Sequence, residues 1–516
     1  MWWQLDERLL ETSTRLIVEH ETYAKSVYDE NRRRSRRSTG RPERLPLHRP
    51  ETWDIDPGFN PYIVRSRRHR IGHAITERLR DRSYEPRPPA GFYVPKADGG
   101  ERLISTFQIA DEVISNRMLR SLTRKNLARL SARAYAYRPD VGPHDAISYI
   151  TTELAREHRL FVAEYDFSRF FDTVDHDYLL EMLDKLGLTR TPLEHHVIEQ
   201  FLKTPEPYVA TSSGMIAGRA RSQGIPQGTS LSLFLANIAA ADLDRGLERL
   251  GVGFVRYADD TLIWSTDYGK VGAAASILHE ASARIGSPIN VKKSPGIRLL
   301  TKSETVHVEM AATKEVDYLG HRIGLRSVQM KPASVDRIKR RVGALIFNNL
   351  LLEPLAGTQE PSRLSSVDRD YVTLLWQLRR YLYGPLTEKE VRKFQRGAIP
   401  PMSFEGVMSF FPLVDDAEGL RHLDEWIASQ IWLAMRKRAR LLRAARLRTP
   451  APHGVGRHQL IGFQTVSSRT GDSIDLRIPS VRKIASVIRL AVSTHGLRAV
   501  SGRAPVYLYG EEDLAK

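Results

Sequence analysis

Residues 253–264 read GFVRYADDTLIW, and the fold that we expect rests mainly on this stretch. Two apolar runs of β-strand composition flank Ala258, Asp259 and Asp260, which predicts that these three residues form the tip of a hairpin. A turn accounts for one aspartate, but two adjacent carboxylates between apolar strands are costly unless a cation neutralises them. The pattern therefore predicts a divalent-cation site, and carboxylate oxygens suit Mg²⁺.

A third carboxylate lies upstream, in residues 160–176, which read LFVAEYDFSRFFDTVDH. LFVAEY predicts a buried strand with Asp166 at its carboxyl end, and DYLLEMLDKL then predicts a helix. Taken alone, Asp166 is more simply explained as a helix N-cap. Three carboxylates from two strands, however, suit a two-metal site, where one ion activates a 3′-hydroxyl and the other stabilises departing pyrophosphate.

Between these two blocks, residues 222–238 read SQGIPQGTSLSLFLANI. Gly224, Pro226 and Gly228 predict a tight turn, and an apolar helix follows it. Backbone N–H groups at such a helix entry can bind a triphosphate or a template backbone. Taken alone, the block is better explained as an ordinary loop that enters a helix.

Together, and in this order, the three blocks resemble the palm motifs of reverse transcriptases. YDFSRFFD resembles the first palm motif of the family, GIPQGTSLS resembles its PQG motif, and YADD resembles its metal-binding tip. The resemblance covers roughly residues 90–325, which is near half of the chain. It implies an RNA-directed DNA polymerase of the α+β class with a right-hand arrangement of fingers, palm and thumb.

The resemblance also implies a division of the chain. Helical extensions are expected on both sides of the polymerase, and a helical insertion is expected in the palm at about 177–215. The expected parts are an N-terminal helix and basic arm (1–70), fingers (71–155), palm (156–325), a helical thumb or maturase-like part (330–450) and a C-terminal region (451–516).

Single residues receive roles from the same resemblance. The metal ligands would be Asp166, Asp259 and Asp260, holding two Mg²⁺ ions, with Mn²⁺ as a substitute. Phe171 matches the aromatic gate that clashes with a ribose 2′-hydroxyl, which implies dNTPs as substrates; otherwise it is a plain core aromatic. The other implied contacts are Lys96, Arg102, Phe167, Gln227 and Gly228 with the dNTP, and Arg138 and Tyr257 with the template and primer.

Two of these assignments leave alternatives open. Lys293, in NVKKS (290–294), fits the spacing of a lysine that protonates departing pyrophosphate as a general acid. The adjacent Lys292 is equally basic, and either side chain could simply face solvent. Lys96 and Arg102 lie on a predicted hairpin over 91–105, where they either hold the triphosphate or are only solvated.

The composition fits a nucleic-acid enzyme. Lys and Arg number 78 against 61 Asp and Glu, a net charge of +17 in 516 residues, which indicates an anionic partner. Residues 31–50 carry eight arginines and one acid, which predicts a mobile arm that contacts phosphates or, alternatively, a solvated linker. The absence of cysteine excludes disulfides, zinc fingers and Fe–S clusters and fits the cytoplasm.

The expected partners follow from this interpretation. They are an RNA template (a non-coding RNA), the DNA product and dNTPs, with a second copy or a partner protein also considered. No stretch of 18 apolar residues and no signal peptide occurs, so no membrane is expected. The chain most resembles bacterial enzymes of antiphage defence and abortive infection. Alternatives are untemplated or protein-primed synthesis, an enzyme like those of group II introns and other retroelements, and a maturase-type RNA-binding protein.

Overall fold

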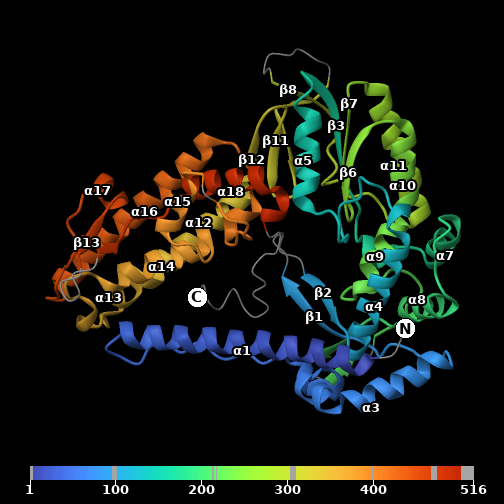
Figure 1. Ribbon diagram of the computed structural model, residues 1–516, viewed down its shortest axis with the longest axis horizontal. Helices are drawn as coiled ribbons and strands as arrows, with labels where there is room; N and C mark the ends of the chain where they lie inside the picture. The colour runs from blue at the N-terminus through green and yellow to red at the C-terminus, as the bar shows by residue number, and fades with distance from the viewer. Residues whose placement is uncertain are drawn as a thin grey trace. The chain divides into compact units, whose positions relative to one another are not determined.

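The computed structural model (Figure 1) describes residues 4–95, 101–211, 214–216, 218–302, 310–397, 399–466 and 473–500. The chain forms two compact units, and each has its own helices and sheets. The first unit comprises Met1–Glu21, His48–Ala146 and Arg156–Lys314, and the second comprises Thr22–Leu47, Ile147–Ala155 and Glu315–Lys516. Because helices combine with mainly antiparallel sheets, the predicted α+β class is confirmed.

A five-stranded sheet in the order β6-β7-β3-β8-β9 forms the centre of the first unit. Its strands are β3 (Arg159–Asp166), β6 (Gly253–Tyr257), β7 (Asp260–Ser265), β8 (Gly296–Thr301) and β9 (Ala312–Thr313). Strand β3 pairs antiparallel with β7 on one side and with β8 on the other. Because both of its edges are bonded, β3 has a fixed position, and so has its last residue.

Two helices cover this sheet, α10 (Ala241–Leu250) and α11 (Tyr268–Ile285). Helix α11 packs against β3 and β7, and α10 packs against α11 beside the β6–β7 hairpin (Figure 1). Gly246 makes the close approach of the two helices possible, because a Cβ there would lie 2.8 Å from Cγ2 of Ile277. The hairpin is therefore supported from one side by packed helices.

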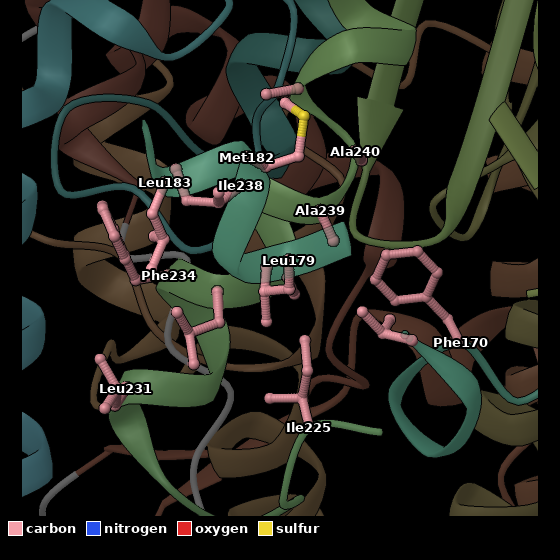
Figure 2. Packing of buried hydrophobic residues seen from close by; sticks show 14 of the residues in the cluster. Phe170, Leu179, Met182, Leu183, Ile225, Leu231, Phe234, Ile238, Ala239 and Ala240 are labelled. Atoms are coloured by element: carbon pink, nitrogen blue, oxygen red, sulfur yellow. The ribbon is translucent and has the colours of Figure 1, made fainter. Parts of the chain in front are cut away.

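A second group of helices forms the core around the start of the palm-like sequence. It comprises α4 (Ile109–Asn126), α6 (Phe170–Thr173), α7 (His176–Lys185), α8 (Pro192–Lys203) and α9 (Ser230–Ala239). Figure 2 shows side chains of α6, α7 and α9 facing one another with Ile225. Phe170, Leu179 and Phe234 are at most 2% exposed, and each such buried side chain contributes about 1.5–3 kcal/mol.

A four-stranded sheet in the order β2-β1-β4-β5 completes the first unit. Its strands are β1 (Ala90–Pro95), β2 (Glu101–Thr106), β4 (Tyr208–Thr211) and β5 (Gly214–Ile216). The antiparallel pairing of β1 with β2 confirms the predicted hairpin over 91–105. The helical prediction for 177–215 is wrong at its end, because Tyr208 and Val209 pair in parallel with β1. Aromatic and β-branched residues favour such a strand.

The remaining elements of the first unit are short helices and one long helix. They are α2 (Thr52–Ile55), η1 (Pro57–Phe59), α3 (Pro61–Arg80) and η2 (Leu127–Arg129), together with the first part of α1 (Leu5–Arg37). Helix α3 begins with Asn60 as N-cap, whose side chain accepts hydrogen bonds from the N–H groups of Tyr62 and Ile63, and Pro61 occupies the first turn.

The second unit is mostly helical. Its helices are α5 (Pro143–Leu154, mainly in this unit), α12 (Pro332–Ile346), η3 (Phe347–Leu351), α13 (Leu352–Ala356), η4 (Pro361–Arg363), α14 (Arg369–Tyr383), α15 (Glu388–Phe394), η5 (Val407–Phe410), α16 (Ala417–Ala444), α17 (Arg457–Ile461), α18 (Val481–His495) and η6 (Leu497–Ala499). Its strands are β10 (Glu315–Tyr318), β11 (His321–Gly324), β12 (Val328–Met330), β13 (Gln464–Val466) and β14 (Ser473–Asp475).

The arginine-rich stretch at residues 31–50 differs from the predicted mobile arm. Helix α1 continues to Arg37, and the side chain of Arg37 is 2% exposed. Its Nη1 donates to Oδ1 of Asn349 at 2.7 Å, and its Nε lies 3.3 Å from Oε1 of Glu353. The prediction is wrong for residues 31–37, because these partners, far along the sequence, compensate the charge of a buried arginine.

Among the described residues, no helix is both long enough and apolar enough to cross a membrane.

Candidate active site

The strand register places two of the three predicted carboxylates opposite each other. Asp166, the last residue of β3, pairs directly with Asp260, the first residue of β7. Tyr257 pairs with Asp260 across the β6–β7 hairpin, so Ala258 and Asp259 form a two-residue turn. The predicted hairpin tip therefore lies beside the end of β3, and all three carboxylates lie at one edge of the sheet.

The carboxylates repel one another. Burial first, and then the negative charges of Asp166, Asp259 and Glu164, raise the pKa of Asp260 to about 7. A carboxyl group that is buried and close to other carboxylates is costly to ionise. A cation bound here would remove that cost, which is the physical reason for expecting one.

The carboxylate of Asp166 is held by the segment 290–294. Nζ of Lys293 lies 2.8 Å from Oδ2 of Asp166, and Nδ2 of Asn290 donates to the same oxygen at 3.2 Å. The backbone N–H of Asn290 also donates to the carbonyl of Asp166 at 2.7 Å. The hydrogen bond to Asp166 raises the pKa of Lys293, so this side chain is an ammonium at neutral pH.

Below the turn, Arg256 is buried in β6. Its guanidinium forms a bidentate pair with Asp244 of α10, with Nε–Oδ1 at 2.7 Å and Nη2–Oδ2 at 2.6 Å. Nη1 donates to the carbonyl of Ala258 at 2.9 Å. Ala258 has a φ of +60°, a conformation that costs a residue with a Cβ about 1–2 kcal/mol. The arginine therefore supports a strained turn one residue before Asp259.

The predicted PQG turn is held against the chain that follows β3. The N–H of Ile225 donates to the carbonyl of Phe171 at 2.6 Å, and that of Gly224 donates to Val174 at 2.7 Å. Gly228 has a φ of +95°, and a Cβ there would lie 2.1 Å from the carbonyl oxygen of Ser105 in β2. The turn thus brings together the end of β3, the 91–105 hairpin and the start of α9.

Phe171 and Gln227 each contact neighbours of this turn or of the block that follows β3. The ring of Phe171 is half-buried and packs edge-on against Phe170 and Tyr137, at centroid distances of 5.9 and 6.4 Å. Nε2 of Gln227 donates to Oδ1 of Asp172 at 2.8 Å. Both side chains therefore lie where the first palm-like block meets the PQG turn.

The other predicted residues lie in varied surroundings. Phe167 is 2% exposed, and Tyr257 is half-buried, with a pKa raised by burial. Arg138 is only 7% exposed at its side chain, where Nη1 donates to the carbonyl of Ser131 and Nη2 lies 2.7 Å from Asp140. These internal contacts use the guanidinium that was expected to touch template.

Lys96 lies outside the described residues, and for Arg102 only the backbone pairing with Val94 is described.

The chemistry of the carboxylates fits a hard divalent cation, because oxygen donors and excess negative charge are what Mg²⁺ requires. In the described part of the chain, however, no group of three or more His, Cys, Asp or Glu side chains is arranged to hold a metal ion. The ammonium of Lys293 lies on Asp166 instead. The three aspartates would therefore have to reorient to share an ion, while their backbones already lie at one edge.

Residues 94–323 match the family described as reverse transcriptase (RNA-dependent DNA polymerase). The matched residues include the three aspartates, the PQG turn and Phe171. The chain contains a reverse transcriptase domain. The resemblance inferred from the motifs is thereby confirmed at the level of the family, and the subtype associated with antiphage defence stays a prediction.

One curated relative is similar to part of the chain. Protein YkfC of Escherichia coli (strain K12) is 25% identical over 193 residues. The match covers 37% of this chain and 49% of YkfC, so the chain spans about half the length of the curated relative.

Solved telomerase structures also resemble the chain. The apo telomerase of Candida tropicalis, truncated from its C-terminal domain, has 13% identity and a TM-score of 0.37, and the match covers 51% of this chain and 60% of that one. Telomerase of Candida albicans in complex with a TWJ fragment of telomeric RNA has 13% identity and a TM-score of 0.38, covering 72% and 58%. The corresponding complex from Candida tropicalis has 12% identity and a TM-score of 0.40, covering 70% and 64%.

Three residues that hold Asp166 or the turn before Asp259 in place were not predicted from the sequence. Asn290 binds Asp166 by both side chain and backbone, although only the lysines of NVKKS were singled out. Arg256 is a charged residue among the apolar residues of GFVRY. This pattern could have predicted an ion pair, because a buried cation requires an anionic partner. That partner, Asp244, lies on a neighbouring helix and carries no local signal.

Proposed function

We propose that the chain is an RNA-directed DNA polymerase that adds dNTPs to the 3′ end of a primer. The observation that carries the proposal is the direct pairing of Asp166 with Asp260, beside the turn that carries Asp259, within residues matched to the reverse transcriptase family. In this proposal the chain has fingers (71–155), a palm (156–325) and a thumb (330–450).

We assign Asp166, Asp259 and Asp260 to two Mg²⁺ ions, for which Mn²⁺ can substitute. When bound, such ions activate the primer 3′-hydroxyl and stabilise the charge on the departing pyrophosphate. Burial and the neighbouring negative charges raise the pKa of Asp260, and this supports the assignment, because a bound cation would offset the cost of ionising it. The contribution of the chain is to hold the three carboxylates at adjacent strand ends.

The proposed nucleotide site lies at the PQG turn. Phe171 is half-buried beside Gly224 and Ile225, and in the proposal its ring excludes a ribose 2′-hydroxyl, which selects dNTPs. Gln227 and Gly228 would border the nucleotide base and sugar, while Lys96 and Arg102 would hold the triphosphate. The close approach of Gly228 to the carbonyl oxygen of Ser105 supports this placement for Arg102, because it brings strand β2, which carries Arg102, to the turn.

Lys293 is the proposed proton donor to the departing pyrophosphate. It is an ammonium at neutral pH, and its side chain, 67% exposed, can turn from Asp166 toward a bound substrate. General acids of this kind contribute about 10²–10⁴-fold in rate.

The biological setting that we propose is antiphage defence in the cytoplasm, with a non-coding RNA as template. GTSLSLFLANIAA resembles the defence-associated group more than intron enzymes. The net charge of +17 supports an RNA partner that stays bound.

Sequencing of the nucleic acid that copurifies with the full chain tests the proposal. The variant is Asp259→Asn, and the matched control is Asp267→Asn, because Asp267 caps α11 and asparagine caps a helix equally well. We expect one discrete RNA in every preparation, and complementary DNA only with the wild type and the control. DNA without a complement in the bound RNA would indicate untemplated or protein-primed synthesis. RNA without any DNA would indicate a maturase-type protein.

A primer-extension assay with an RNA template, dNTPs and Mg²⁺ measures the activity directly. We expect Asp259→Asn to lower the rate by about 10³-fold or more, because transition-state charge stabilisation by a metal is worth several kcal/mol. Equal rates for this variant and the control would overturn the proposal. For the biological setting, plaque formation on cells that carry each variant should rise only with Asp259→Asn.

A further inference from the structure

A groove rich in arginine lies between the first part of α1 and α4, and its lining includes none of the three aspartates of the candidate active site. Five arginines line it, and we call it the α1–α4 groove: Arg8, Arg15, Arg117, Arg120 and Arg124. Its volume is about 470 Å³, which is within the usual range of ligand-binding pockets. All of its lining residues belong to the first unit.

Helical spacing brings these side chains together. Arg120 and Arg124 follow Arg117 by three and seven residues, so the three arginines lie on one face of α4 along about 10 Å of helix. On α1, Arg8 and Arg15 are seven residues apart and face the same groove. Nη2 of Arg15 lies 3.6 Å from Oε1 of Glu112, which joins the two helices.

The positive charge in the groove exceeds the negative charge. Five arginines stand against two acids of the lining, Glu11 and Glu112, and against Glu19, which lies 2.9 Å from Nη1 of Arg15, so cations remain in excess. Nη1 of Arg8 lies 2.6 Å from Glu11, but Arg120 and Arg124 are exposed and form no ion pair with any residue that the structure describes.

The arginines of the two helices also repel one another. Burial lowers the pKa of Arg117, and the positive charge of Arg8 lowers it further. Cations on opposite walls of a groove raise the free energy of the fold, and an anion between them would reverse the sign of this contribution.

We propose that the α1–α4 groove binds the phosphate backbone of an RNA strand. Guanidinium groups bind phosphates in a bidentate manner, and a row of them over about 10 Å suits successive phosphates better than a single anion. The choice of RNA rests on the proposed function, in which RNA is the template. The groove shares no residue with the carboxylate site, so its role is to hold the RNA and not to act on it.

Salt-dependent binding of a labelled single-stranded RNA of mixed sequence to the full chain tests the proposal. The variant is Arg120→Gln/Arg124→Gln. The matched control is Arg249→Gln/Lys270→Gln, which removes two exposed cations of α10 and α11 that likewise form no ion pair among the described residues. Each phosphate contact on a single strand contributes about 0.7 to the slope of log K against log salt.

We expect the groove variant to lower that slope by about 1.4 and to bind RNA more weakly, while the control keeps the wild-type slope. An unchanged slope, or an equal fall in the control, would overturn the proposal. The proposal would also fail if the groove variant bound RNA as the wild type does and lost binding only to a DNA strand of the same sequence. Thermal melting should match the wild type, because both arginines are exposed.

Primer extension separates this inference from the proposed function. With primer–template at saturating concentration, the groove variant should retain the wild-type kcat. Only the RNA concentration that gives half of the maximal rate should rise. If the wild type binds RNA through the groove but extends no primer, the polymerase proposal fails and the groove assignment stands.

Discussion

Arg256 donates a hydrogen bond from Nη1 to the carbonyl oxygen of Ala258 at 2.9 Å, while its other nitrogens bind the carboxylate of Asp244. Arg256 is 1% exposed, so this bond is formed without competition from water. Because Ala258 precedes Asp259 in a strained turn, the buried arginine determines where the backbone places that carboxylate. The ion pair is thus part of the geometry of the candidate active site.

Replacing this ion pair separates stability from activity. Arg256→Met alone leaves Asp244 buried without its partner and should cost about 3–5 kcal/mol of folding free energy. Arg256→Met/Asp244→Leu removes both charges and should regain most of the melting temperature. The carbonyl of Ala258 still lacks its donor, so kcat for primer extension should stay at least about tenfold below the wild type, or about 1.4 kcal/mol. Full recovery of both quantities would show that Arg256 acts only in folding.

Gly228→Ala should damage the contact between the PQG turn and β2. The positive φ costs alanine about 1–2 kcal/mol, and its Cβ would lie 2.1 Å from the carbonyl oxygen of Ser105. We expect a lower melting temperature and a higher KM for dNTPs. The control is Gly272→Ala in α11, where the new Cβ would have no atom within 4 Å beyond its chain neighbours and the backbone of its own helix, and where stability should rise by about 0.5–1 kcal/mol. A KM unchanged in both variants would count against a nucleotide site at this turn.

Phe171→Ala tests the proposed selection against ribonucleotides. Removing the ring should raise kcat/KM for rNTPs relative to dNTPs by about 10–100-fold, the range that one steric contact provides. Phe170→Ala is the comparison: that ring is 2% exposed in the core, so its loss should cost about 3–5 kcal/mol of stability without changing discrimination. If the two variants discriminate equally, Phe171 is only a core aromatic.

Lys293→Gln and Lys292→Gln decide between the two adjacent lysines. Only Lys293 lies against Asp166, at 2.8 Å, and its loss should lower kcat by about 10²-fold if it protonates the pyrophosphate. Lys292 is exposed, and its substitution should leave kcat unchanged. Single-turnover extension with one dNTP is the suitable measurement, because it reports the chemical step. A larger effect at position 292 would reverse the assignment.

The local pattern was sufficient for some elements and misleading for others. The hairpin over 253–264 was predictable because apolar runs on both sides of a polar pair have few other solutions. The structure of residues 31–37 was not predictable, since Arg37 is paired with side chains more than 300 residues away, such as Asn349. Likewise, the parallel pairing of Tyr208 with Ala90 depends on a strand far away in the chain.

Short segments with their own periodicity were enough to predict the family, the three carboxylates and their places at two strand ends and in a hairpin turn. Only the tertiary structure decided that Asp166 faces Asp260, that Asp244 neutralises Arg256 and that two rows of arginine line one groove. These relationships join segments distant in sequence. They depend on strand register and helix packing, which are set by the free energy of the whole fold and leave no trace in any single segment.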